Sequence, residues 1–212
     1  MEGSVTSVTA DVVKWGVAVD LKRCTGCQAC TIACKAENGT PRGVFWTRVL
    51  EKEEGTYPFA YKVFMPVRCN HCADPLCVPV CPTGASYQRE KDNLVLIDQE
   101  KCIGCHSCVV ACPYQVRFIP EDDKGYYGAE KTPYEEASYR DWQVGTAQKC
   151  TLCAHRIDKG QEPACVETCP TRALVFGDLN DQDSEISDLI RERSNFQPRA
   201  ELGTDPCVFY LT

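Results

Sequence analysis

Short apolar runs, each next to a cysteine-rich loop, dominate the pattern of hydrophobic and polar positions along the chain. VAVDLKRCTGCQAC (17–30) and LVLIDQEKCIGCHSC (94–108) match in register: an apolar run, an aspartate, spacers that include a basic residue, and the loop. VCPTGASY (80–87) and TCPTRALV (168–175) form a looser pair, in which the loop leads into a strand-like stretch. Because such self-similarity marks a repeated structural unit, we expect a duplicated fold of short strands and short helices around the cysteine loops.

Two stretches depart from this pattern. DSEISDLIRERS (183–194) predicts a helix, because acids fill its first turn, arginines fill its last, and Asp183 or Ser184 can cap it. We expect its apolar face, Ile186, Leu189 and Ile190, to pack on its own domain. Residues 120–148 are polar, acidic and rich in tyrosine. A long solvated loop is the simpler interpretation, and a docking surface is the one that we favour.

Seventeen cysteines among 212 residues point to metal ligation. Cysteines two residues apart are common in metal sites, whereas disulfides would not require one tetrad to recur along the chain. The net charge of −7 gives no electrostatic reason to expect nucleic acid binding. No stretch is long and apolar enough to span a bilayer, and the N-terminal MEGSVTSVTADVVKWG contains no export signal. We expect a chain that is soluble by itself and reaches a membrane only through a partner.

Sixteen cysteines fall into four sets that share a terminal C-x3-C unit. Sets one and three have the bacterial ferredoxin spacing C-x2-C-x2-C-x3-C, and sets two and four widen its middle to x4 and x11. A cubane cluster takes three thiolates from one tight loop and its fourth from elsewhere. Set four alone could pass for a zinc site, but four related sets favour clusters. The sets are Cys24, Cys27, Cys30, Cys34; Cys69, Cys72, Cys77, Cys81; Cys102, Cys105, Cys108, Cys112; and Cys150, Cys153, Cys165, Cys169.

The other residues near the loops suggest supporting roles. Sixteen cysteines supply four ligands for each of four clusters, so we expect the three histidines, His71, His106 and His155, to lie beside clusters or at the surface. The basic residues before loops either are solvated or offset cluster charge, and both interpretations stay open. These are Lys22, Arg23, Lys101 and Lys149.

We expect the apolar residues of the loops to shield the clusters from water, and Cys207, flanked by apolar residues, to be a buried inert thiol. The apolar residues are Ile32, Val78, Val80, Ile103, Val109, Val110 and Val166. No nucleotide-binding glycine pattern, nucleophile elbow or free carboxylate or histidine set accompanies them. A chain of one-electron centres without a place for two-electron chemistry is best explained as a relay between two other redox sites.

Four stretches together resemble the four-cluster electron-transfer subunit of molybdopterin oxidoreductases of the dimethyl sulfoxide reductase family. They are GVAVDLKRCTGCQACTIACKAEN, CNHCADPLCVPVCPTGA, CIGCHSCVVACPY and KCTLCAHRIDKGQEPACVETCPTRALVFGDL. The polysulfide or thiosulfate reductase type looks nearest, with the respiratory arsenate reductase type close by. The resemblance implies a large catalytic subunit that holds molybdenum or tungsten on molybdopterin, and often a membrane subunit that exchanges electrons with quinone. It implies a place at the cytoplasmic membrane, on the periplasmic face by co-export with the partner, with the cytoplasmic face left open. A free polyferredoxin is the alternative.

The resemblance also implies an α+β fold of two ferredoxin-like domains around four [4Fe-4S] clusters. Residues 1–65 with 142–212 would hold sets one and four, 66–119 sets two and three, and 120–141 an inserted docking loop, with a C-terminal helical tail. The repeat alone equally allows set one to pair with set two. Lys35 stands where proline would follow Cys34, which affects only the local turn. The implied ligand groups are Cys24, Cys27, Cys30, Cys169; Cys34, Cys150, Cys153, Cys165; Cys69, Cys72, Cys77, Cys112; and Cys81, Cys102, Cys105, Cys108.

Overall fold

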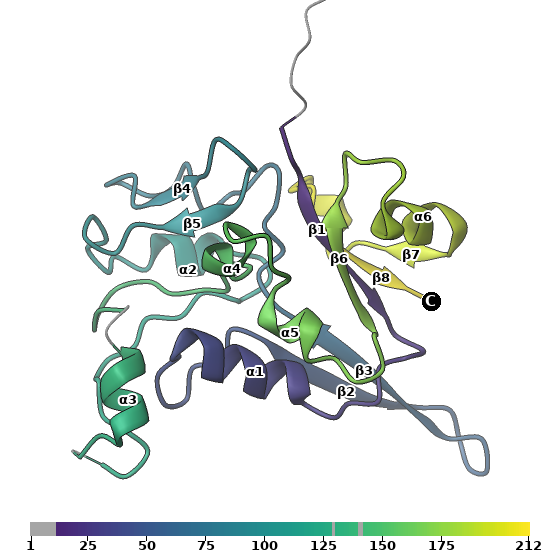
Figure 1. Cartoon of the computed structure of the whole chain (residues 1–212), viewed down its shortest axis with the longest axis horizontal. Helices are drawn as coiled ribbons and strands as arrows, with labels where there is room; N and C mark the ends of the chain where they lie inside the picture. The colour runs from purple at the N-terminus through teal and green to yellow at the C-terminus, as the bar shows by residue number, and fades with distance from the viewer. Residues whose placement is uncertain (1–11, 129, 140–141) are drawn as a thin grey trace, which may run out of the picture.

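The computed structural model describes residues 12–128, 130–139 and 142–212, so most of the N-terminal stretch expected to lack an export signal lies outside the described residues. It mixes short helices and short strands, as an α+β fold requires (Figure 1). The strands are β1 (Trp15–Asp20), β2 (Arg48–Glu54), β3 (Tyr61–Val67), β4 (Ser86–Gln88), β5 (Val95–Ile97), β6 (Leu174–Asp178), β7 (Asn195–Phe196) and β8 (Val208–Leu211). The helices are α1 (Ala29–Asn38), α2 (Ser107–Ala111), α3 (Pro133–Ser138), α4 (Ala154–Ile157), α5 (Ala164–Glu167), α6 (Glu185–Glu192) and the 3₁₀ turn η2 (Ala200–Leu202).

The largest sheet has the strand order β6-β1-β8-β7, in which β1 pairs antiparallel with β6 and parallel with β8. Alternate side chains of β1 enter different clusters, because successive side chains of a strand point to opposite faces. Val17 and Val19 join the apolar cluster that includes Cys30 and Cys165, whereas Ala18 packs with Ile186 of α6. One face of the sheet therefore supports the cysteine loops, and the other carries α6.

Helix α6 forms within the stretch predicted to be helical. The Ser184 hydroxyl accepts a hydrogen bond from the Ser187 backbone N–H and so caps the helix. Ile186 is fully buried against Ala18 and Leu211, and Leu189 and Ile190 pack around them. The apolar face is thus covered by the chain's own sheet, as expected.

In two strand pairs, the strand that precedes one cysteine set pairs with the strand that follows another set. Strand β1, which precedes set one, pairs antiparallel with β6, which follows set four. Strand β5, which precedes set three, pairs antiparallel with β4, which follows set two. The apolar runs before sets one and three and the strand-like stretches after sets two and four thus all contain strands, and the two pairs lie on opposite sides of the molecule (Figure 1).

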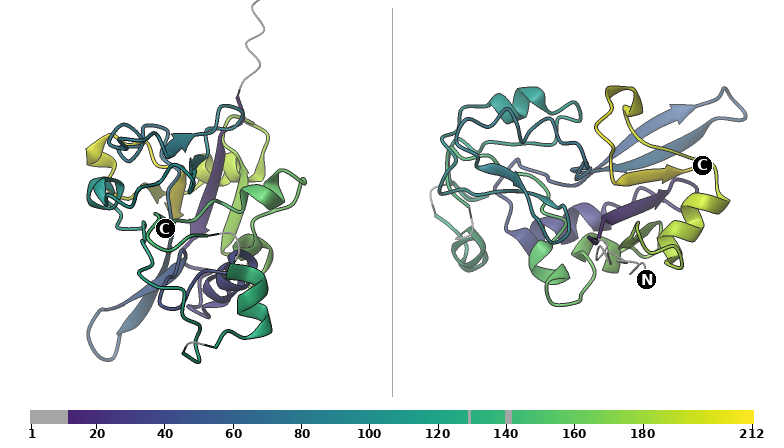
Figure 2. Two further views of the ribbon diagram at one scale, coloured as in Figure 1. Left: turned by 90° about the vertical axis from the view of Figure 1, so that its left-hand side faces the viewer. Right: turned by 90° about the horizontal axis from the view of Figure 1, so that it is seen from above.

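A β2–β3 hairpin extends from the body of the molecule, and the sequence pattern did not predict it (Figure 2). Midway along β3 Phe64 packs against the first cysteine loop at Gly26, where a Cβ atom would lie 2.4 Å from the Phe64 ring. Gly26 also has a φ of +70°, which favours glycine. At its tip Tyr57 and Phe59 are exposed. The hairpin therefore rests on set one and projects outward.

Part of the polar stretch 120–148 is structured. Helix α3 begins at a capping box, in which the Thr132 hydroxyl accepts from the Glu135 N–H and the Glu135 carboxylate accepts from the Thr132 N–H. The Tyr134 hydroxyl contacts the carbonyl oxygens of Lys35 and Ala36, at 3.1 and 2.8 Å, so α3 lies against α1. Within the described residues, no helix combines the length and the apolar character that crossing a bilayer requires.

Candidate metal centres

The four cysteine loops turn through residues of positive φ at the same position, two residues after the first cysteine. Such turns let a short loop curve round and direct several sulfurs inward, and they favour glycine or a strained side chain. Sets one and three then enter helices α1 and α2 through Gln28 and His106, both left-handed as well. The turn residues are Gly26 (+70°), His71 (+42°), Gly104 (+66°) and Leu152 (+54°).

Four cysteines from two different sets line one small cavity. Cys81 comes from set two, and Cys102, Cys105 and Cys108 come from set three. Backbone N–H groups point at two of the sulfurs: Ser86 N lies 3.4 Å from Cys81 Sγ, and Ala147 N lies 3.3 Å from Cys102 Sγ. The loops thus surround a space with sulfur and amide donors.

A second small cavity is lined by the remaining cysteines of the same two sets. Its cysteines are Cys69, Cys72 and Cys77 of set two and Cys112 of set three. Arg117, which is 4% exposed, places Nη2 2.8 Å from Cys77 Sγ and Nη1 2.6 Å from the Ser86 hydroxyl. A buried guanidinium beside a cysteine sulfur is a favourable setting for an anionic thiolate.

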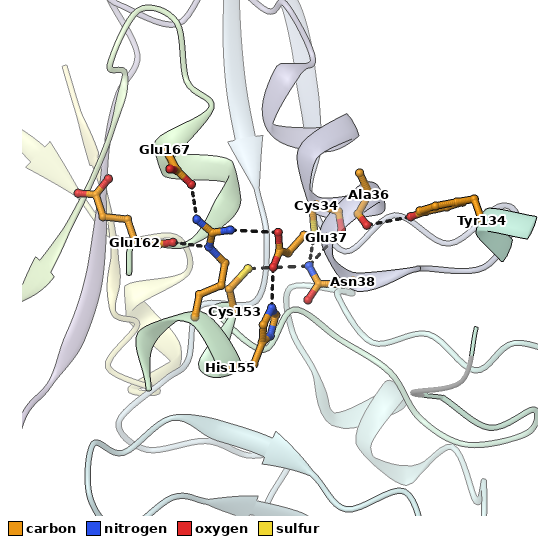
Figure 3. Close-up of polar contacts among 10 residues, drawn as sticks. Cys34, Ala36, Glu37, Asn38, Tyr134, Cys153, His155, Glu162 and Glu167 are labelled. Carbon is orange, nitrogen blue, oxygen red and sulfur yellow. Dashed lines mark hydrogen bonds and ion pairs between the residues drawn. The ribbon is translucent and has the colours of Figure 1, made fainter. Parts of the chain in front are cut away.

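Sets one and four also meet. Asn38, at the end of α1, directs Nδ2 toward both Cys34 Sγ (3.7 Å) and Cys153 Sγ (3.8 Å), as Figure 3 shows. Beside it, Glu37 accepts from His155 Nε2 at 2.7 Å and from Arg156 Nη1 at 3.1 Å. These contacts join the helix of set one to the loop of set four.

The shifted pKa values of several cysteine thiols indicate that a positively charged group suits these sites. Burial and the neighbouring sulfurs raise the pKa of Cys34 and of Cys72 to about 12, and they raise that of Cys150 well above its ordinary value. Burial, with Cys169 and Cys27 nearby, also raises the pKa of Cys24. Thiolates are the form that binds metal, and bound metal supplies the positive charge that crowded sulfurs need. The donor set and the cavities therefore fit a multi-iron cluster.

A basic residue directly precedes each of the four sets, and two of the four are buried. The side chains of Arg23 and Lys101 are 59% and 65% exposed and pair with aspartates. Lys149 is 2% exposed, and its ammonium donates to the carbonyl oxygens of Val95 and Cys150. Arg68 is 1% exposed, and its Nη1 lies 3.1 Å from Cys165 Sγ. The residues expected from the sequence did not include Arg68, although its place directly before Cys69 was the available signal.

The histidines occupy different environments. His71 is 3% exposed and its Nε2 donates to the Cys150 carbonyl oxygen at 3.0 Å, so it ties the loop of set two to set four. Burial, together with nearby Lys149, lowers its pKa well below the ordinary value, which keeps the ring neutral. His155 is near the surface with Glu37, and His106 lies at the start of α2.

The expectation that the apolar loop residues shield the sites from water is wrong for several of them. Ile32, Ile103 and Val110 are 63%, 66% and 85% exposed, and Val80 is exposed as well, whereas Val166 is buried as expected. In the short helices the cysteines themselves occupy the inward face, so Ile32 and Val110, each two residues after a buried cysteine, point outward.

Exposure also separates the cysteines. Of the seventeen, Cys27 and Cys105 are exposed, and the others are buried or partly buried. Cys207 is buried, as expected, and burial raises its pKa to about 12.

Comparison with known proteins agrees with this geometry. Family models described as 4Fe-4S dicluster domains match residues 60–128 and 126–179, and another of that description matches 23–85. A selenate reductase subunit of Mesobacillus selenatarsenatis is 43% identical, over 94% of this chain and 72% of that protein. The arsenate respiratory reductase iron-sulfur subunit ArrB of a Shewanella species is 39% identical, over 94% and 96%. A tetrathionate reductase subunit of Salmonella typhimurium is 40% identical, over 93% and 72%.

Proposed function

The chain belongs to the iron-sulfur electron-transfer subunits of dimethyl sulfoxide reductase-family enzymes, and from this we propose that it relays single electrons between a molybdopterin catalytic subunit and a quinone-linked membrane subunit. The relay would run through four [4Fe-4S] clusters in anaerobic respiration, with a polysulfide, thiosulfate or arsenate-type reductase as the complex. Each cluster, when bound, accepts and releases one electron.

We assign the sixteen ligands to four groups. The observation that carries this assignment is that two separate cavities each hold four cysteines, three from one set and one from the other. By the same exchange between sets one and four, Cys169 completes the group of Cys24, Cys27 and Cys30. Cys34 completes that of Cys150, Cys153 and Cys165, in keeping with the Asn38 contacts to Cys34 and Cys153.

The crossed strand pairing supports the division into two ferredoxin-like units. Pairing of β1 with β6 joins a strand of the first segment, 1–65, to a strand of 142–212, and β4 and β5 pair within 66–119. We propose 120–141 as a docking segment, since exposed tyrosines accompany α3, among them Tyr127 and Tyr134.

Exposed aliphatic side chains next to the exposed cysteines mark where electrons would enter and leave. Ile103 and Val110 surround the loop of Cys105, and Ile32 lies on the helix that follows Cys27. Exposed apolar side chains next to a redox site suit contact with another protein. We propose that one partner subunit covers each of these two places. For the complex as a whole we propose the periplasmic face of the cytoplasmic membrane.

Elemental analysis of protein purified from its native source without oxygen tests the proposal. About sixteen irons per chain, with about one molybdenum or tungsten and a large partner, is the expected result. Iron in a chain purified without either metal and without partners would favour the free polyferredoxin. Zinc in place of iron would refute the cluster assignment.

A substitution in the exposed loop of set three tests whether electrons pass through this chain, whichever way they flow. Cys105→Ser should abolish turnover with a quinol donor, because it removes a ligand of one cluster, while the catalytic subunit still reacts with an artificial dye. Cys207→Ser is the matched control, since Cys207 belongs to none of the four groups, and it should retain both activities. Equal quinol-linked rates in the Cys105→Ser and unsubstituted complexes would contradict the proposal.

A further inference from the structure

Arg68 is among the most deeply buried side chains of the molecule, at 1% exposed. It follows β3 and directly precedes Cys69 of set two, yet its guanidinium does not turn toward that set. Nη1 lies 3.1 Å from the sulfur of Cys165, in set four. The sulfurs of Cys150 and Cys30 are close enough to interact with its charge, and a guanidinium stays protonated in proteins. Arg68 is therefore a fixed positive charge among the cysteines of sets one and four.

Not all nitrogen donors of the Arg68 guanidinium are paired. Nε and Nη2 are buried and have no hydrogen-bond acceptor within the described parts of the chain. Buried donors without a partner are costly, and a buried charge without a counter-charge is more so. Tyr210 interacts with Arg68 electrostatically, and its hydroxyl donates to the Pro66 carbonyl oxygen at 2.9 Å, but it accepts from neither of these two nitrogens. Two buried, unpaired nitrogens on a guanidinium whose third nitrogen lies beside a cysteine sulfur indicate an anion at that place.

We propose that Arg68 sets the reduction potential of the clusters held by sets one and four, by donating hydrogen bonds to their sulfurs and placing one positive charge beside them. One-electron reduction adds one negative charge to a cluster and removes one electron from the donor, with no proton required. A buried cation favours the reduced form more than the oxidised form, and hydrogen bonds to sulfur act in the same direction. Arg68 thus keeps these potentials higher than the sulfur-rich interior alone would give. The inference depends on the cluster ligation proposed above.

The chain offers a matched control. Arg23 also stands directly before a cysteine set, but its side chain is 59% exposed and pairs with Asp20. Solvent screens an exposed charge far more than a buried one. Arg23→Gln and Arg68→Gln therefore remove the same charge at the same sequence position relative to a set, and they differ in burial.

The test is potentiometric titration of the anaerobically purified complex, followed by EPR, with signals of sets one and four identified from their change in a Cys27→Ser variant. Arg68→Gln is expected to lower the midpoint potentials of those signals, and Arg23→Gln is expected to leave them unchanged. Unchanged potentials in an Arg68→Gln complex that retains all its iron would overturn the inference and leave the proposed function intact. An unsubstituted complex without EPR-active clusters would instead refute the proposed function.

A second measurement needs no substitution of Arg68, in case Arg68→Gln does not retain iron. All arginines of the complex are labelled with ¹⁵N, and the reduced complex is measured by pulsed EPR. Arg117 also lies beside a sulfur, so it is replaced by lysine to remove its contribution to the signal. A nitrogen coupling to the signals of sets one and four is expected. Its absence would overturn the inference.

Discussion

Lys35 replaces the proline that follows the last cysteine in the other three sets, and it lengthens the helix. Proline disfavours helical continuation, so α2 ends at Ala111, before Cys112 and its proline, whereas α1 continues to Asn38. The Lys35 ammonium is held at 3.0 Å by four oxygens of the following loop, those of Thr40 (carbonyl and hydroxyl), Pro41 and Val44. The added turn carries Glu37 and Asn38, which contact the loop of set four. One residue thereby links two sets far apart in sequence.

The Glu135 carboxylate makes the start of α3 sensitive to pH. Its pKa lies below the ordinary value, because the backbone N–H groups of Thr132 and Tyr126 donate to it. A lowered pKa in the folded state means that the stabilisation is complete above the ordinary pKa of about 4.3 and is lost as pH falls through the folded-state value. Hydrogen exchange at the Tyr126 and Thr132 amides, corrected for intrinsic rates, should therefore be protected at neutral pH and lose protection in acid.

Glu135→Gln should weaken this protection at neutral pH and remove its acid dependence. The Ser187 amide is the control, since an uncharged hydroxyl caps it. Equal acid dependence at the Ser187 and Thr132 amides would show that Glu135 is not the titrating group.

At the scale of elements, local signals predicted some structures and left others out. The strands beside the cysteine loops and helix α6 were predicted from apolar runs or caps within a few residues, and the structure contains these elements. The β2–β3 hairpin was missed because β2 is mostly exposed and polar and β3 is a short, partly buried apolar run that contains a proline, so neither strand shows an alternating pattern. Its stability depends on pairing between the strands and on Phe64 packing against Gly26.

The contact between α6 and the sheet depends on a missing side chain. A Cβ atom at Gly177 of β6 would lie 2.7 Å from Cγ2 of Ile186. Gly177→Ala should therefore destabilise the protein by about 1–3 kcal/mol through overpacking, measured as a fall in the apparent melting temperature. Ile186→Leu removes Cγ2, so the double variant should recover part of that loss. No recovery would mean that the clash with Ile186 is not the cause.

At the scale of the whole molecule, the sixteen candidate ligands followed from spacing, but their grouping did not. The sequence repeat equally allowed sets one and two to pair, because local similarity carries no information on which distant strands meet. The structure brings β1 to β6 and β4 to β5, and this arrangement depends on contacts between remote residues such as Val17 and Phe176. The inward or outward direction of the basic residues was undecidable for the same reason, as Arg23 and Lys149 show.

Removal of iron should affect the two sides of the molecule unequally. The β6-β1-β8-β7 sheet has an apolar core that includes Val17, Ile186 and Leu211, whereas residues 66–119 bury fewer apolar side chains apart from cysteines. Metal binding is coupled to folding where the core is small. Stepwise chelation should therefore expose amides of 66–119 to hydrogen exchange before those of β1 and β8. Simultaneous loss of protection throughout would contradict this unequal dependence.

The two buried cations that precede sets two and four reach across the molecule in opposite directions. Arg68 extends from 66–119 to Cys165, and Lys149 extends back to the carbonyl oxygen of Val95. A chimera that takes 66–119 from another protein would therefore leave Cys165 without its guanidinium partner. Grafting such a segment would require the arginine at position 68 to be transplanted with it.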